Sequence, residues 1–533
     1  MGNMMRKGRA MCVIFGSINT NALEDTYTGL SRLEYRGYDS FGYAAIKNGD
    51  VNVVRRLGAV DRGAFNKTYD AVIGHVRWAT NGVVSEANAH PQYCDDFYVV
   101  HNGVITNAPD HMLDTKWLAN LLKMNEGDTE TIYNKIEGDN AFVFINKSTG
   151  NIWCVAKGSK RLFLTKNGYV SSDLNALAGF SDRASVLKNG FCLLGKGELV
   201  SKPVTVPSTP PLVEDNQEHR MLSEIKEQAN LTNDTKTNFE LGLYLNRFSL
   251  GAMDIMATGS SLHAGMFGGY ALEQRGVSTR CIHASQAPYY TLCDHVLAIS
   301  QSGETKDIIG AAPKYFTCLT NTPHSMLYDM AEKTILLNVG QEYAVAATKT
   351  FTMSCMKISG TTTPMSEQIN DLIDRGGEIQ DIAGRIMGYD HFIFLGDRQN
   401  YPIALEGALK FKEVAYVHAE GMPASEMKHG PIALVDYKVP SLFIVTENFR
   451  PEIISNIQEI KSRRGFVVVI THDAIKDKLE GLADIIFSCK DTGEKYSQSL
   501  VCNVVLQLLA YYIAIGRGIN PDKPKNLAKC VTV

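Results

Sequence analysis

The sequence lacks the features that mark several common classes of protein. Its 533 residues include eleven cysteines, but no two of them form a C-x-x-C pair and no metal-type spacing occurs. No G-x-x-x-x-G-K-[ST] stretch is present, which argues against a nucleotide-binding P-loop. The net charge of −4 offers no electrostatic basis for binding nucleic acid or an anionic membrane, and no local basic patch stands out.

The sequence also has little that indicates a membrane or an export signal. The apolar stretch at 11–15 stops at Gly16, too soon for a signal peptide. Asn503 and Gln507 interrupt the most apolar segment, Leu500 to Ile515, which falls short of the roughly 20 residues needed to span a bilayer. We expect a buried core helix there. Because the number of cysteines is odd, free thiols in a reducing compartment are favoured, and we predict a cytoplasmic protein.

The chain is long enough for roughly three domains. Short β-type runs separated by Gly, Asn and Asp fill residues 12–202 and predict an α+β domain rich in antiparallel sheet. We expect strands at 12–15, 43–46, 51–54, 71–74, 97–100, 141–145 and 152–155, and helices at 23–34, 114–124 and 129–136.

A proline-rich polar stretch at 203–217 predicts an exposed linker. Strands and helices alternate beyond it, which predicts doubly wound α/β domains with parallel sheets. The same order of elements occurs twice and suggests an internal duplication, with domains at 218–380 and 381–533.

Ser300 to Thr305, with the sequence SQSGET, lies between an expected strand at 295–299 and a helix that begins near Asp307. Such a turn directs backbone N–H groups and the positive end of the helix dipole at one point, while its hydroxyls can donate to a phosphate. An ordinary capped loop is the alternative. Without a lysine in the loop, a small monophosphate fits better than a nucleotide.

Cys12 follows Met11 at the start of the first expected strand. A cysteine with a free α-amine can act as an N-terminal nucleophile, because the amine serves as the base for the thiol. Taken alone, Cys12 is better explained as a buried structural residue. In the same way Lys410 and Glu413, three residues apart on an expected helix, form an ordinary salt bridge when considered in isolation.

Several motifs nevertheless occur together in register: LEYRGYDS at 33–40, HVRWATNG at 75–82, NAHP at 88–91, HNG at 101–103 and GDTE at 127–130. They resemble the class II glutamine amidotransferase domain. With the downstream half, the chain from Met11 to Val533 resembles the glutamine–fructose-6-phosphate aminotransferase (isomerising) family. The resemblance implies an N-terminal nucleophile (αββα) glutaminase domain at 12–202 followed by two sugar isomerase (SIS) domains.

The resemblance assigns roles in the glutaminase domain. Cys12 would be the nucleophile, and Asn102 with the backbone of Gly103 would form the oxyanion hole. The implied contacts with glutamine are chemically reasonable, because a guanidinium matches its α-carboxylate and an aspartate matches its α-ammonium. The implied glutamine-binding residues are Arg77, Trp78, Thr80, Asn81 and Asp128, of which Trp78 would also gate an ammonia channel unless it is simply a core residue.

In the SIS domains the resemblance makes Glu413 the base that moves a proton between C1 and C2 of the sugar, with Lys410 tuning it. His429 would open the sugar ring from a neighbouring subunit, which implies a homodimer. Lys529, in a C-terminal lid that otherwise reads as a basic tail, would form a Schiff base with the ketose. The implied sugar-phosphate contacts are Ser260, Ser261, Ser300, Gln301, Ser302, Thr305, Val345 and Ala528.

Some positions depart from the family's pattern. Residues 1–11 would keep the nitrogen of Cys12 in an amide, so we expect their removal or translation from Met11. Val13 stands where the family has glycine, Asn81 where it has histidine, and Ala347 lacks a hydroxyl. These changes put the rate and the affinity for glutamine in question more than the type of reaction.

The implied activity converts glutamine and fructose 6-phosphate into glutamate and glucosamine 6-phosphate without a metal or an organic cofactor. Three alternatives stay open. An amidophosphoribosyltransferase is disfavoured because its pyrophosphate-ribose motif is absent. A sugar-phosphate sensor would bind a ligand without turnover, and an ammonia-dependent synthase would carry an impaired glutaminase.

Overall fold

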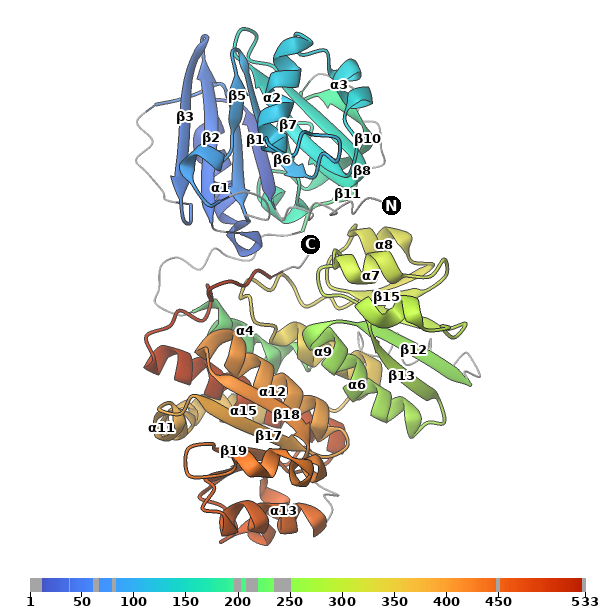
Figure 1. Cartoon of the computed structure of the whole chain (residues 1–533), viewed down its shortest axis with the longest axis vertical. Helices are drawn as coiled ribbons and strands as arrows, with labels where there is room; N and C mark the ends of the chain where they lie inside the picture. Colours follow the sequence, from blue (N-terminus) through green and yellow to red (C-terminus); the bar gives the residue numbers. More distant parts are fainter. Residues whose placement is uncertain are drawn as a thin grey trace. The chain divides into compact units, whose positions relative to one another are not determined.

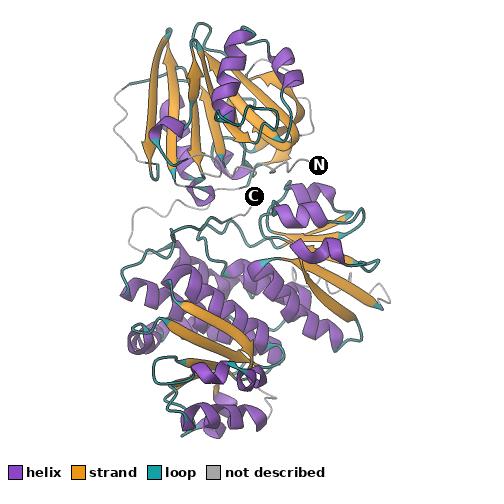
Figure 2. Cartoon of the chain, viewed as in Figure 1, coloured by secondary structure: helices purple, strands orange, loops and turns teal. Residues whose placement is uncertain are grey.

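The computed structural model describes residues 12–37, 39–60, 67–78, 83–195, 203–207, 219–233, 251–446 and 451–529. The chain forms two compact units. Of the described residues, those from 12 to 207 belong to the first unit and those from 219 to 529 to the second. Strands dominate the first unit, and long helices surround the sheets of the second (Figures 1 and 2). The domain bounds 218–380 and 381–533 remain predictions, and most of the linker at 203–217 lies outside the described residues.

The described part of the first unit holds an eleven-stranded sheet in which the strands pair antiparallel. The strand order is β3-β2-β4-β1-β9-β8-β7-β6-β5, with β10 paired to β8 and β11 to β10. The bounds are β1 (Val13–Ile18), β2 (Ser40–Lys47), β3 (Asp50–Leu57), β4 (Ala71–Arg77), β5 (Gln92–Cys94), β6 (Phe97–Gly103), β7 (Asn140–Asn146), β8 (Ile152–Leu164), β9 (Tyr169–Ser171), β10 (Arg183–Leu193) and β11 (Val204–Thr205).

The two halves of this sheet pack on each other, and residues that alternate along a strand contribute to different cores. On β1, Ile14 joins a core shared with residues of β6 and β7, whereas Val13 and Phe15 join a second core that includes α1 (Ala22–Ser31). A third core lies between β6, β7 and the helices α2 (Asp114–Met124) and α3 (Thr129–Lys135). The three cores order the layers as helix, sheet, sheet, helix.

The second unit contains two parallel five-stranded sheets with the same topology, β13-β12-β14-β15-β16 and β18-β17-β19-β20-β21. This order is that of flavodoxin-like doubly wound folds, and it confirms the predicted parallel sheets. The bounds are β12 (Ala252–Ala257), β13 (Ser278–His283), β14 (Val296–Ile299), β15 (Thr317–Thr320), β16 (Lys333–Leu336), β17 (His391–Gly396), β18 (His418–Pro423), β19 (Ser441–Ile444), β20 (Val467–His472) and β21 (Ile485–Cys489).

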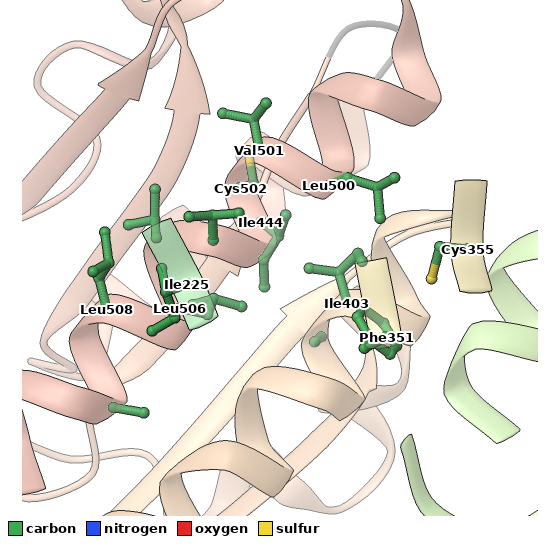
Figure 3. Packing of buried hydrophobic residues seen from close by; sticks show 14 of the residues in the cluster. Ile225, Phe351, Cys355, Ile403, Ile444, Leu500, Val501, Cys502, Leu506 and Leu508 are labelled. Carbon is green, nitrogen blue, oxygen red and sulfur yellow. The ribbon is translucent and has the colours of Figure 1, made fainter. Parts of the chain in front are cut away.

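Helices cover these sheets and meet in one large apolar core. Figure 3 shows part of that core, where α15 meets residues of α4, α9 and α12. At Gly268 of α6 an added Cβ would lie 2.1 Å from Ile358 of α9, so glycine permits this close helix contact. The α-helices of this unit are α4 (Arg220–Leu231), α6 (Gly259–Glu273), α7 (Lys306–Ala311), α8 (Met326–Met330), α9 (Lys349–Ser359), α10 (Ser366–Asp374), α11 (Gly376–Ile386), α12 (Asn400–Ala415), α13 (Pro451–Ser462), α14 (Asp473–Lys476) and α15 (Lys495–Gly516).

Helix α15 is long and apolar enough to cross a membrane, but 83% of its apolar window is buried inside the protein. Gln507 shows how a polar residue is held inside this core. The Gln507 side chain accepts a hydrogen bond from Gln228 of α4 at 2.7 Å and donates one to the Thr348 carbonyl at 3.4 Å. Because a buried amide needs such partners, these contacts fix α15 against its neighbours, as the sequence predicted.

Candidate active sites

Cys12 lies immediately before β1 and is 5% exposed. Its Sγ lies 3.9 Å from the Trp78 carbonyl oxygen, to which the thiol donates. Val13 pairs with Val76, so Arg77 at the end of β4 is the cross-strand neighbour of Cys12. Burial raises the pKa of the Cys12 thiol to about 11, although the charge of Arg77 opposes that rise. The thiol therefore needs a base before it can react.

The predicted oxyanion-hole residues end β6. Asn102 is buried, and Gly103 has a φ of +150°. An added Cβ on Gly103 would lie 2.2 Å from the carbonyl oxygen of Asp139, so this position admits only glycine. Arg77 is likewise buried, at 4% exposure.

Asp128 has a local structural role in this conformation. It is the N-cap of α3, where its carboxylate accepts hydrogen bonds from Thr131 N at 3.3 Å and Thr131 Oγ1 at 2.5 Å. These two bonds lower the pKa of Asp128, which is exposed. The other predicted glutamine contacts, Thr80 and Asn81, lie outside the described residues.

In the second unit the predicted pair Lys410 and Glu413 belongs to a larger charged network. Glu406, Lys410 and Glu413 follow one another at i, i+4 and i+7 along one face of α12. Lys410 Nζ lies 2.6 Å from Glu413 Oε2, 3.1 Å from Glu406 Oε1 and 3.4 Å from Ser260 Oγ. Ser260 Oγ and His263 Nδ1, both on α6, each lie 2.8 Å from a Glu406 oxygen. The network thus joins the two helices.

Burial and charge fix the protonation of this network. Glu406 and Lys410 are both 0% exposed, whereas the Glu413 side chain is 20% exposed. Burial opposes ionisation of Glu406, but Lys410, His263 and Ser260 outweigh it and hold its pKa at about 2. Burial likewise opposes the charge on Lys410, yet Glu406 and Glu413 raise its pKa. Lys410 is therefore an ammonium at neutral pH, and Glu413 is the carboxylate of the network with access to solvent.

The segment Ser300 to Thr305 turns from β14 into α7, close to the expected strand and helix. Ser300 Oγ lies 2.8 Å from Thr305 Oγ1 and accepts the Gly303 N–H at 3.0 Å, while Ser302 Oγ accepts the Glu304 N–H at 3.2 Å. Gly303 has a φ of +63°, and an added Cβ would lie 1.9 Å from Ser325 Oγ. The loop is tight, and the hydroxyls of Ser300 and Thr305 meet within it.

The C-terminal segment brings Lys529 into the second unit. The Lys529 side chain is 4% exposed, and its Nζ forms an ion pair with Glu342 Oε2, which is fully buried. Val345 and Ala528, two predicted sugar-phosphate contacts, are half-buried, as is Ser261. His429 ends the short helix Ala424–His429 and is exposed.

The structure thus brings Ser260, Lys410 and Glu413 together, as it does Cys12 and Arg77. Sequence reasoning missed Glu406, His263 and Glu342. The i, i+4 spacing of Glu406 and Lys410 was a usable signal for the first of these. No comparable signal marked Glu342, because its partner Lys529 lies far away in the sequence.

Comparisons with known proteins agree with both halves of this description. A family model for the SIS domain matches residues 251–361 and 386–517. The glutamine–fructose-6-phosphate aminotransferase (isomerizing) of Aquifex aeolicus is 34% identical over 98% of this chain and 100% of its own length. The enzyme of the same name from Sulfolobus acidocaldarius is 31% identical, with the same coverage of both chains.

Among solved structures, the C-terminal domain of glucosamine-fructose-6-phosphate aminotransferase from Francisella tularensis is 30% identical. It covers 58% of this chain and 99% of its own, with a TM-score of 0.52. Because the curated relatives align over nearly the whole chain at more than 30% identity, the chain belongs to the glutamine–fructose-6-phosphate aminotransferase (isomerizing) family.

Proposed function

We propose that this protein transfers the amide nitrogen of L-glutamine to fructose 6-phosphate and isomerises the product to glucosamine 6-phosphate, with release of glutamate. The full-length match to the family is the observation that carries this proposal. The buried network of Ser260, Glu406, Lys410 and Glu413 supports it, because a polar network of this kind positions a carboxylate for proton transfer.

The first unit would act as an N-terminal nucleophile glutaminase of the αββα class. Cys12 would attack the amide carbon, and Asn102 Nδ2 with the Gly103 N–H would stabilise the oxyanion, each donor contributing about 3 kcal/mol. Arg77, Thr80, Asn81 and Asp128 would hold glutamine. Asp128 would have to exchange its bonds to Thr131 for the substrate's ammonium. Trp78 would gate the passage of ammonia.

The second unit would hold the hexose phosphate. The phosphate would bind at Ser300, Gln301, Ser302 and Thr305, with Ser260, Ser261, Val345 and Ala528 around the sugar. Lys529 would form an imine with the open ketose, and Glu413 would move the proton between C1 and C2. The ammonium of Lys410 would stabilise the negative charge that develops on the enediol oxygens. His429 would reach the site of a second copy in a cytoplasmic homodimer.

Replacing Cys12 tests the coupling of the two activities. We expect Cys12→Ala to reduce glucosamine 6-phosphate formation from glutamine by at least about 10³-fold, because the nucleophile is lost. Formation from ammonium chloride should change by less than twofold. Product would be quantified by mass spectrometry. Cys192→Ala, a cysteine of β10, is the matched control. Equal loss with both nitrogen sources would contradict the proposal, and no product from wild type with either source would favour a sugar-phosphate sensor.

The buried, high-pKa thiol also predicts a processed terminus. Since Cys12 needs its own α-amine as base, we expect the active protein to begin at Cys12, which intact-mass measurement would detect as the absence of residues 1–11. A Met11→Pro variant that retains the extension should lose glutaminase activity. Full glutaminase activity from protein with an intact Met1 would contradict this prediction.

A further inference from the structure

Two carboxyl groups and two lysines meet at low exposure beside the start of α9. Glu342 is 0% and Glu224 3% exposed, and the side chains of Lys349 and Lys529 are 3% and 4% exposed. Burying charged groups is costly unless they are paired. Which lysine pairs with which carboxyl group therefore indicates the role of each residue.

Both carboxylate oxygens of Glu342 accept hydrogen bonds. Its Oε1 accepts the Thr348 N–H at 2.9 Å and the Thr350 N–H at 3.1 Å, and its Oε2 accepts Thr350 Oγ1 at 2.6 Å and the Lys529 ammonium. Burial opposes its ionisation, but Lys529 and the hydroxyl and amide donors outweigh burial and lower the pKa of Glu342. This carboxylate is fixed in orientation and points at Lys529 Nζ.

Glu224 of α4 holds the loop that carries Glu342. Its carboxyl group accepts hydrogen bonds from the N–H groups of Tyr343 and Ala344, the two residues that follow Glu342. Burial and the nearby Glu342 charge raise the pKa of Glu224 to about 8, so it is largely protonated at neutral pH. Lys349 pairs with Glu227 at 2.6 Å, and Lys529 is thus the cation that faces Glu342.

We propose that Glu342 is the catalytic proton acceptor and donor for imine formation at Lys529, and that Glu224 is a positioning residue for the Glu342 loop. This inference rests on the Schiff-base role given to Lys529 above. The titratable groups that face the pair are Glu224 and Glu227 from α4 and Lys349 from α9.

The step balances without a further reactant. Glu342 takes one proton from the Lys529 ammonium, and the neutral amine attacks C2 of the ketose to give a carbinolamine. The nitrogen's second proton passes to the C2 oxygen, and Glu342 returns the first to the departing hydroxyl, which leaves as water. The products are a protonated imine, water and an ionised Glu342.

Trapping with sodium cyanoborohydride in the presence of fructose 6-phosphate tests this step. The reagent reduces the imine to a stable amine, and peptide mass spectrometry locates the adduct. We expect wild type to be labelled at Lys529. Glu342→Gln should be labelled about 10² to 10³ times more slowly, the loss typical of removing a general acid–base group, and Glu342→Asp should recover part of the rate. The matched control is Glu378→Gln, at an exposed glutamate of α11, which should change the rate by less than twofold.

A milder variant keeps the test decisive if Glu342→Gln fails to fold. Thr350→Val removes one hydrogen bond to the Glu342 carboxylate, which raises its pKa. The acid limb of the labelling rate against pH should therefore shift to higher pH, whereas a purely structural role would lower the rate without a shift. Equal rates and profiles for wild type and Glu342→Gln would overturn the inference and leave the Schiff base standing. No adduct on wild-type Lys529 would instead refute the Schiff base itself.

Discussion

Replacing Lys410 by methionine is expected to lower the free energy of unfolding by about 3–5 kcal/mol. Lys410 is fully buried and pairs at 3.1 Å with Glu406, which is also fully buried. Methionine fills a similar volume but leaves the Glu406 carboxylate with His263 and Ser260 as its partners among the residues that the structure describes. Urea unfolding followed by far-ultraviolet circular dichroism measures the change, because the long helices lie in the second unit.

Two further variants separate lost pairing from lost packing. The double variant Glu406→Gln/Lys410→Met removes both charges, and we expect it to recover at least half of the lost stability. Lys428 provides the exposed comparison, since it pairs with Glu459 at 2.7 Å while both side chains are about one-third exposed. Lys428→Met should cost less than about 1 kcal/mol. A loss below about 1 kcal/mol for Lys410→Met would show that the buried pair is unimportant for stability.

The sequence predicted most of the buried strands, because each is an apolar run bounded by turn residues. The strand expected at 141–145 and the helix expected at 114–124 are examples, observed as Asn140–Asn146 and Asp114–Met124. The sequence did not predict β10, because this strand is defined by its pairing with β8 and not by a pattern of apolar residues of its own. Its own alternation is broken by polar residues, and it pairs with both ends of β8 on either side of an irregularity between Lys188 and Gly190.

The functional residues likewise include some that the sequence pattern predicts and others that only the tertiary structure brings together. Lys410 and Glu413 are visible in sequence because helix periodicity places them on one face. The Ser260–Glu406 contact joins residues 146 positions apart, and the Lys529–Glu342 ion pair joins residues 187 apart. Periodicity carries no information about such pairs, so tertiary structure is needed to find them.

Acidification is expected to unfold the first unit through three buried histidines. His75, His90 and His101 are 0%, 4% and 2% exposed, and the rings of His75 and His90 lie 4.0 Å apart. His90 Nδ1 accepts the His101 backbone N–H at 3.4 Å, which requires that nitrogen to be unprotonated. Burial lowers the pKa of His75 to about 3, that of His90 well below its usual range, and that of His101, although Asp114 opposes the change at His101.

These shifts set the direction of the pH effect. The unfolded chain binds protons at all three histidines below about pH 6.5, whereas the folded unit binds them only at lower pH. Stability is therefore fully present above about pH 6.5 and is lost as pH falls toward about 3. Each histidine contributes up to about 1.4 kcal/mol per pH unit, or about 4 kcal/mol for the three together.

Tryptophan fluorescence measures this transition selectively, because Trp78, Trp117 and Trp153 all lie in the first unit. We expect the urea midpoint seen by fluorescence to fall steeply between pH 6.5 and 5. His90→Asn removes one of the three titrating groups. Whatever stability the variant loses at pH 7.5, the slope of its urea midpoint against pH should be about one-third shallower than that of wild type. The exposed His111→Gln is the matched control and should leave the slope unchanged. An unchanged slope in His90→Asn would mean that proton uptake at other groups drives acid unfolding.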